Sequence, residues 1–178
     1  MPRLNILSDD DLSNFYQIPK LEEDERPFIF ELEEADINYL NSFDDIAGKI
    51  HYILLLGYFR ASQYLFNFTF QAVRKDVWHI IKTYFPDSKF PKRQVTRHRY
   101  YSNRKTLLEK YEIAIYTSKF ENKLKKYLQD LVRQHIVPKY LFDSLLDYCH
   151  RHQIVRPNYS TLQKLISKAC NKIGRAHV

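Results

Sequence analysis

Two stretches of the sequence hold side chains that could do chemistry or bind a charged ligand. The first is Cys149-His150-Arg151-His152, which places metal-ligating and proton-transferring groups next to one another. Cys149 falls on an apolar stripe with helical spacing, and this favours a small thiol buried in a core over a metal ligand. Four ligands with the spacing of a tetrahedral zinc site are not visible. We therefore expect no metal and no cofactor.

The second stretch lies between Lys89 and Lys110 and is strongly basic. It contains one acid, Glu109, and eight basic residues: Lys89, Lys92, Arg93, Arg97, Arg99, Arg104, Lys105 and Lys110. A dense basic cluster favours binding to a polyanion, because every phosphate that is neutralised releases counterions. Tyr100 and Tyr101 lie inside the cluster. We expect them to pack or to bond phosphate, since stacking on bases belongs mostly to single-stranded targets.

Sequence motifs of the common enzyme classes are absent. The three glycines, Gly48, Gly57 and Gly174, are isolated, so no glycine-rich phosphate loop is present, and there is no GxSxG, HExxH or EF-hand pattern. The carboxylates of residues 9–45 fall at expected cap, loop and helix-surface positions. We expect a chain without catalytic residues and without a small-molecule substrate.

Charge is divided unevenly along the 178 residues, whose formal net charge is +7. Residues 1–48 hold three basic and 13 acidic residues, a balance of −10, whereas residues 49–178 hold 25 basic and eight acidic residues, a balance of +17. This asymmetry favours a nucleic-acid partner. A solvated surface whose two halves partly neutralise each other would give the same totals.

The elements that must position these residues are helices. Ser8 is expected to cap a helix that ends before Pro19, and later apolar stripes predict helices over 33–40, 46–58, 73–84, 120–132 and from Pro138 to about Cys149. The helix over 46–58 is so apolar that we expect it at the centre of a core. Residues 22–27 are expected to be a loop, and the aromatic residues 58–70 an extended segment or a bent loop.

Ser102 is predicted to cap a helix over 103–111 whose first turn carries Arg104 and Lys105. Cations there oppose the helix dipole, at a cost of about 0.3–1 kcal/mol each, and a bound anion would relieve the conflict. A basic surface helix held by packing is the alternative. The predicted DNA-binding residues of this stretch are Lys92, Arg93, Arg97, Arg99, Tyr101, Ser102, Asn103, Arg104 and Lys105.

A last helix is predicted to begin at Ser160, with Gln163 completing a capping box. Leu162, Leu165 and Ile166 are expected to face inward, which leaves a polar and basic face that suits a helix-turn-helix reader or, equally, a solvated surface. The predicted DNA-binding residues here are Arg156, Asn158, Tyr159, Ser160, Thr161, Gln163, Lys164 and Lys168, and Ser167, Asn171 and Lys172 are expected on the same outward face.

The pattern as a whole predicts an all-α fold of two helix-turn-helix-like units in tandem, near residues 70–111 and 119–175, with an acidic N-terminal segment. We place the domain boundary so that residues 1–112 form the first unit and residues 113–178 the second. No apolar run approaches the roughly 18 residues that a membrane span requires, and no secretory signal is visible, so we expect a cytoplasmic protein without a membrane partner.

The order of features resembles the amino-terminal region of the Tn-three family of replicative bacterial transposases over nearly the whole chain. The similar segments are Leu7–Leu12 with Ile18-Pro19, Phe30–Asp36, Ala47-Gly48, Ser102–Lys105, Arg151–Pro157 and Tyr159–Leu162. Lys49 departs from the family, which has an aromatic residue there.

The resemblance implies a DNA-binding module that recognises the terminal inverted repeats of a transposon and positions them for cleavage by a metal-dependent Asp-Asp-Glu domain elsewhere in a longer chain. The implied partners are double-stranded DNA and other domains of the same transposase. The alternative is a helical protein-interaction domain, in which the acidic part docks on a basic surface within a nucleoprotein assembly.

Overall fold

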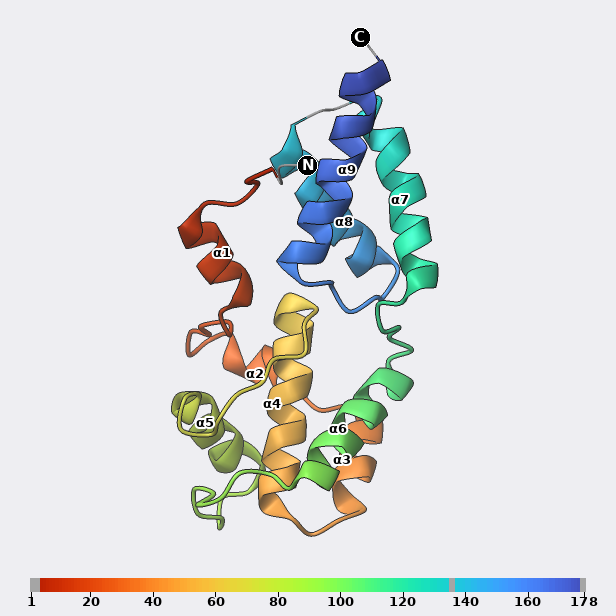
Figure 1. The fold of residues 1–178 in the computed structure, drawn as a ribbon. Coiled ribbons are helices and arrows are strands. Elements are labelled where there is room, and N and C mark those ends of the chain that lie inside the picture. Colours follow the sequence, from red (N-terminus) through yellow and green to blue (C-terminus); the bar gives the residue numbers. More distant parts are fainter. Residues whose placement is uncertain (1–3, 135–136, 177–178) are drawn as a thin grey trace. The chain divides into compact units, whose positions relative to one another are not determined.

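The structure, a computed structural model, describes residues 4–134 and 137–176, and the side chains of residues 4–134 and 137–172. The described residues form nine helices, and outside them only an isolated bridge between Ala114 and Ile154 has paired backbone of the β type (Figure 1). The prediction of an all-α fold is confirmed. None of the described helices is long and apolar enough to cross a membrane.

The chain divides into two compact units. Residues 18–113 form one, which we call the α4 unit, and the described residues of 4–17 and 114–176 form the other, which we call the α9 unit. The boundary therefore falls next to the expected one, but the N-terminal segment differs from the expectation, because it packs with the C-terminal residues. Leu7 and Phe15 are buried in the core of the α9 unit, and their burial accounts for this placement.

The α4 unit is built around its longest helix. Its elements are α2 (Arg26–Ile29), α3 (Glu34–Asn41), α4 (Ile46–Ser62), α5 (Arg74–Tyr84) and α6 (Arg97–Lys110), and α2, α5 and α6 all pack against α4. The short α2 was not predicted, and it begins inside the expected loop over residues 22–27. Gly57 allows the close approach of α2, because a β-carbon at that position would collide with the Phe30 ring.

Helix α4 is buried on every side, as its composition predicted. Every residue from Ile50 to Phe59 is buried, because a helix that is apolar all round can escape water only at the centre of a core. The expected loop over 58–70 begins later than predicted, since α4 continues to Ser62 and ends where Gln63 adopts a left-handed conformation, with φ of 57°.

Three polar side chains of α4 are buried with it, and each has a partner on a different helix. The Tyr52 hydroxyl donates to Asp36 of α3 at 2.8 Å, and the Tyr58 hydroxyl donates to Asp76 of α5 at 2.5 Å. The His51 ring lies 3.0 Å from the amide nitrogen of Asn103 of α6. These contacts satisfy groups that would otherwise destabilise the core.

Each buried carboxylate also has a cationic partner. Arg26 donates to Asp76 at 2.7 Å, and the Lys110 ammonium lies 2.5 Å from Asp36. Burial alone would raise the pKa of Asp36, but hydrogen bonds from Lys110, the Glu33 backbone and Tyr52 hold that pKa below its usual value. Asp36 of the acidic N-terminal segment and Asp76 of α5 thus serve as internal counter-charges in the core.

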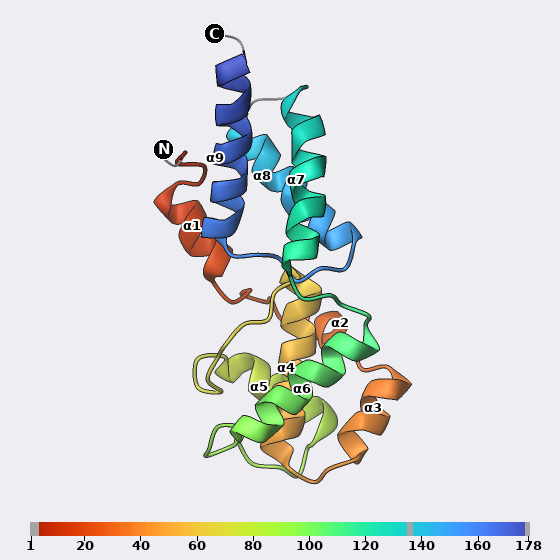
Figure 2. The ribbon, with the colours of Figure 1, turned by 45° about the vertical axis from the view of Figure 1, so that its right-hand side comes forward.

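The α9 unit joins α1 (Asp9–Tyr16) to α7 (Ser118–Val132), α8 (Pro138–Arg151) and α9 (Tyr159–Ala176). The last three helices pack on one another in pairs, with α7 and α9 side by side (Figure 2). Ser8 caps α1 and Pro138 opens α8, as predicted. The core includes Leu124, Leu128, Leu145, Leu162 and Ile166.

The connections before the two predicted reading helices are long. Residues 152–158 join α8 to α9, and residues 85–96 join α5 to α6, whereas the turn of a compact helix-turn-helix has about three to four residues. Helix α6 packs on α4, and α5 packs on the same helix. The two units are therefore helical with longer links than that motif uses.

Two predicted helix starts were wrong. Helix α6 begins six residues earlier than expected, at a Thr96 cap whose hydroxyl accepts from the Arg99 backbone, so Ser102 lies inside the helix. Helix α9 begins at Tyr159, and the Asn158 side chain accepts from the Thr161 backbone at 2.9 Å in place of the expected Ser160 capping box. In both cases a second capping side chain lies nearby in the sequence, and packing selects between the two.

The buried His51 predicts a pH dependence of stability. The Asn103 amide nitrogen, which donates to the Gly48 carbonyl oxygen, is a donor only. It therefore donates its second hydrogen to Nδ1 of His51, and Nδ1 can accept this hydrogen only when the ring is neutral. Burial, with a contribution from the Arg104 charge, lowers the pKa of His51 from 6.5 to about 4. Between pH 6.5 and about pH 4, the His51 ring is protonated in the unfolded chain and neutral in the folded chain. The free energy of unfolding therefore decreases as the pH falls through this range, by up to about 3 kcal/mol.

Urea unfolding between pH 7 and pH 4.5 measures this dependence. His51→Gln should flatten the slope of the unfolding free energy against pH, whereas His98→Gln, at an exposed position, should leave the slope as in the wild type. An unchanged slope in His51→Gln would contradict the assignment.

Candidate nucleic-acid interface

Helix α6 presents a row of exposed side chains in the α4 unit. Arg97, Tyr101 and Lys105 are exposed and follow one another at a spacing of four, which places them on one face of the helix. The Arg97 guanidinium lies 5.7 Å from the centre of the Tyr101 ring. Lys92 and Arg93 are also exposed, in the loop that precedes the helix.

The first turn of α6 carries Arg97, His98 and Arg99 and no acid. The predicted conflict between cations and the helix dipole therefore exists, but with different residues than expected, because the helix begins at Thr96. Tertiary packing holds the helix in place, since Asn103 and Leu107 are fully buried inside the α4 unit, where α6 packs on α4. The arrangement leaves positive charge at the positive end of a dipole.

Several predicted residues of α6 are occupied within the protein. Asn103 has no exposed surface and accepts a hydrogen bond from Tyr39, so its assignment to DNA binding was wrong. The Arg99 guanidinium lies 3.6 Å from the centre of the Phe43 ring, and Arg104 donates to the Tyr100 hydroxyl at 3.0 Å. Ser102 is half-buried. The sequence could not show these contacts, because every partner except Tyr100 lies far away along the chain.

Helix α9 carries the corresponding face of the α9 unit. Ser160, Lys164, Lys168 and Lys172 are exposed and lie at a spacing of four. Thr161 is half-buried beside them, and Asn158 is exposed although its side chain caps the helix. This row combines three lysines with a hydroxyl group, side chains that bind phosphates and base edges.

Other predicted residues of α9 hold the N-terminal segment. The Gln163 amide donates to the Leu4 carbonyl at 2.8 Å, and the Tyr159 hydroxyl accepts from the backbone of Ile6 and Leu7. Ser167, expected on the outward face, is buried and accepts from the Leu4 backbone at 3.0 Å. Gln163, Tyr159 and Ser167 thus follow a second row, which residues 4–7 cover.

Arg156 lies inside the same unit. Its guanidinium is 4.0 Å from the centre of the Phe15 ring and donates to the Phe15 carbonyl oxygen. Tyr159, which is buried, donates its backbone N–H to the Tyr16 hydroxyl at 2.9 Å. The structure therefore gives Arg156 and Tyr159 structural contacts with α1 where the sequence predicted DNA contacts, because residues 4–17 fold back onto this helix.

The residues of the Cys149–His152 stretch lie in different environments, some buried and some exposed. Cys149 is fully buried, as expected, and burial raises the pKa of its thiol to about 11. The exposed His152 ring stacks on Tyr148, with 4.1 Å between ring centres. Over the described residues, no group of three or more His, Cys, Asp or Glu side chains is placed to hold a metal ion.

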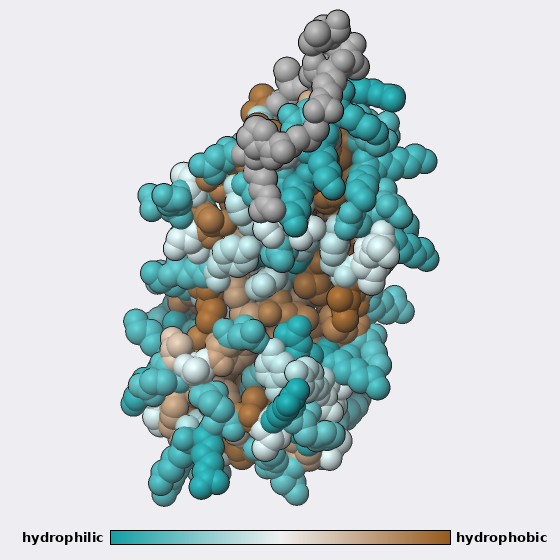
Figure 3. Space-filling model, viewed as in Figure 1, coloured by the Kyte–Doolittle hydropathy of each residue, from teal (hydrophilic) through white to brown (hydrophobic). Residues whose placement is uncertain are grey.

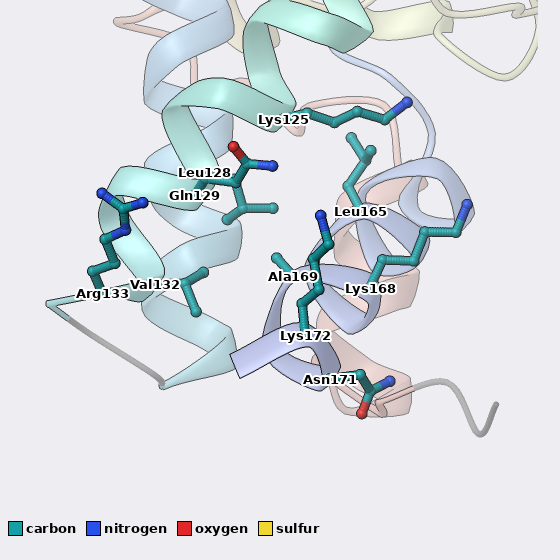
Figure 4. A pocket seen from close by; sticks show the side chains of 10 residues that line it. All are labelled: Lys125, Leu128, Gln129, Val132, Arg133, Leu165, Lys168, Ala169, Asn171 and Lys172. Atoms are coloured by element: carbon teal, nitrogen blue, oxygen red, sulfur yellow. The ribbon is translucent and has the colours of Figure 1, made fainter. Parts of the chain in front are cut away.

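A groove between α7 and α9 is lined partly by residues that were not predicted as site residues. Hydrophilic side chains cover the surface over α7 in Figure 3, and Figure 4 shows the groove itself. Its lining combines the predicted Lys168 with polar residues from both helices that were not predicted as site residues: Lys125, Gln129, Arg133, Asn171 and Lys172. The four-residue spacing of Lys164, Lys168 and Lys172 was the one available signal.

Comparison with known families assigns this chain to one of them. The model of a family described as a domain of unknown function, DUF4158, matches residues 6–169 of the chain. No curated protein sequence matches the chain. Since the match covers nearly all of the described residues, the chain belongs to the DUF4158 family.

The contacts of Arg156 predict that its replacement lowers stability. Arg156→Ala removes a cation–π contact and a hydrogen bond from the packing of α1, and the free energy of unfolding should fall by about 1–3 kcal/mol. Lys164→Ala, at an exposed position, should change it by less than about 0.5 kcal/mol. Urea denaturation followed by circular dichroism measures both, and equal stabilities of the two variants would contradict the structural role.

Proposed function

We propose that this member of the DUF4158 family binds duplex DNA through one basic helix face on each unit. The observation that carries the proposal is a row of exposed cations on one face of each helix. Arg97 and Lys105 of α6 lie eight residues apart with Tyr101 between them, and Lys164, Lys168 and Lys172 of α9 lie at a spacing of four. Glu109, the next position of the α6 row, pairs with Lys105 at 3.7 Å, and no acid lies in the α9 row from Ser160 to Lys172. A row of this kind neutralises phosphates and releases counterions.

The distribution of charge supports the same partner. Residues 49–178 carry a balance of +17, and both rows lie within them. Two acids of the α4 unit, Asp36 and Asp76, are buried with cationic partners, so they do not offset the exposed positive surface. The first turn of α6 adds backbone N–H groups that can donate to phosphate oxygens.

A more specific role rests on the family resemblance. The chain acts as the N-terminal part of a bacterial DNA transposase and recognises the terminal inverted repeats of its transposon, and the two units contact successive stretches of one repeat. It supplies binding and positioning, and another domain supplies the strand cleavage. A DNA partner of this kind places the protein in the bacterial cytoplasm.

The residues best placed for base contacts are those that remain exposed. They are Arg97, Tyr101 and Lys105 of α6 and Ser160 and Lys164 of α9. Lysine and arginine recognise guanine, and hydroxyl groups bond either base edges or phosphates. Lys92 and Arg93, in the loop before α6, add phosphate contacts on this proposal.

Fluorescence anisotropy with two duplexes tests the proposal. One duplex carries an end of the element that encodes the chain, and the other has the same length and a random sequence. The wild-type protein should bind the end duplex more tightly, and both affinities should fall steeply as salt increases. No binding of either duplex at low salt would overturn the proposal, and equal affinities would overturn its sequence-specific part.

Single substitutions locate the contacts. Lys164→Ala and Arg97→Ala should each weaken binding to the end duplex by about 1–3 kcal/mol if they contact bases. Lys139→Ala is the control, because Lys139 is exposed on α8 and pairs with Asp143 at 2.8 Å. Affinities of Lys164→Ala and Arg97→Ala equal to that of the control would contradict the site assignment.

A further inference from the structure

The groove between α7 and α9 has a cationic rim. Figure 4 shows Lys125, Gln129 and Arg133 extending from α7, with Lys168 and Lys172 extending from α9. Among the residues whose side chains the structure describes, ten line the groove, and they include four cations and no acid. Glu121 of α7 pairs with Lys125 at 2.6 Å and also attracts Lys168, while Arg133, Lys168 and Lys172 are exposed cations of the rim.

The floor of the groove is apolar but closed. Leu128, Val132 and Leu165 lie between the two helices, and their exposed fractions are 1%, 2% and 5%. An amphipathic helix docks in a groove by burying its apolar face against exposed apolar side chains. This floor has almost no such surface left, because α7 and α9 already pack on each other there. The rim adds charge and hydrogen-bond donors for a ligand.

The side chains of the rim are of the types that bind the phosphate backbone of a nucleic acid. Two amide side chains, Gln129 and Asn171, lie among the cations, and amides and cations together donate to phosphate oxygens without reading sequence. Lys168 and Lys172 belong to the same row as Lys164, so the groove continues the exposed face of α9 toward α7. A ligand that lies along this row meets both helices.

One side of the beginning of α9 is covered. The Tyr159 backbone N–H is bonded to Tyr16, and residues 4–7 lie on Gln163 and Ser167. In a helix-turn-helix protein the first residues of the recognition helix contact the bases. Here α1 and residues 4–7 cover one side of that end, and Ser160, the lysine row and the groove remain accessible on the other.

We propose that the α7–α9 groove binds the phosphate backbone of duplex DNA and supplies affinity that does not depend on sequence. Arg133, Lys168 and Lys172 neutralise phosphates, and Gln129 and Asn171 donate to their oxygens. This inference rests on the proposed function and assigns it a division of labour: the groove holds the backbone, while side chains such as Lys164 and Arg97 contact bases.

The test is a triple variant, Arg133→Gln with Lys168→Gln and Lys172→Gln. Its matched control is Lys119→Gln with Lys123→Gln and Lys139→Gln. This control also removes three positive charges, but from exposed positions of α7 and α8 outside the groove. Affinity is measured by anisotropy for end and random duplexes from 50 to 300 mM salt.

The groove variant should lose affinity for both duplexes by the same factor, on the order of 10- to 100-fold at 0.1 M salt, and the slope of log affinity against log salt should become shallower by up to about 2.7. The control should lose much less. A loss confined to the end duplex would overturn the proposal, since the groove would then read bases, and so would a groove variant that behaves like the control.

One further variant tests whether charge alone is responsible. Lys168→Arg with Lys172→Arg preserves the charge and should bind both duplexes like the wild type, and a loss of affinity in this variant would overturn the proposal. If the wild-type protein binds no duplex at all, the proposed function fails with it. If the wild type binds and the groove variant matches its control, only the groove assignment fails.

Discussion

The structure of the α4 unit depends on the complete burial of one helix. Helix α4 is too apolar to face water on any side, but it also carries His51, Tyr52 and Tyr58 into the core, where an unpaired polar group is costly. Asn103, Asp36 and Asp76 meet these groups, each from a different helix. The surrounding helices are therefore held to α4 by directed hydrogen bonds as well as by packing, and their orientations follow from these pairs.

The same constraint sets the basic face of α6. Because Asn103 and Leu107 must point into the core, helical geometry turns Arg97, Tyr101 and Lys105 outward. Helix α9 repeats this logic with different chemistry. Its row of Tyr159, Gln163 and Ser167 binds the backbone of residues 4–7, and its lysine row faces solvent. In both units, polar groups buried on one side of a helix decide which cations are left on the other.

Local sequence predicted those parts of the fold that neighbouring residues settle. The apolar stripes located most of the helices, and Ser8 and Pro138 marked helix starts that the structure confirmed. Predictions failed where two capping side chains compete, as Thr96 does with Ser102 and Asn158 with Ser160. Either residue can cap a helix, but each caps a different first turn. The choice therefore depends on which turns pack against the core, and that information lies in distant segments.

The sequence by itself determined that the chain is helical, that its positive charge lies beyond residue 48, and that α4 is central, because composition and periodicity act over a few turns of helix. Only the tertiary structure decided which basic and polar residues are exposed. Asn103, Arg156 and Gln163 look like ligand-binding residues in the sequence, and each is bound to a segment more than 50 residues away. Arg133 and Lys172 line one groove because α7 and α9, which are separate in the sequence, pack on each other and bury Leu128 and Leu165 in one core.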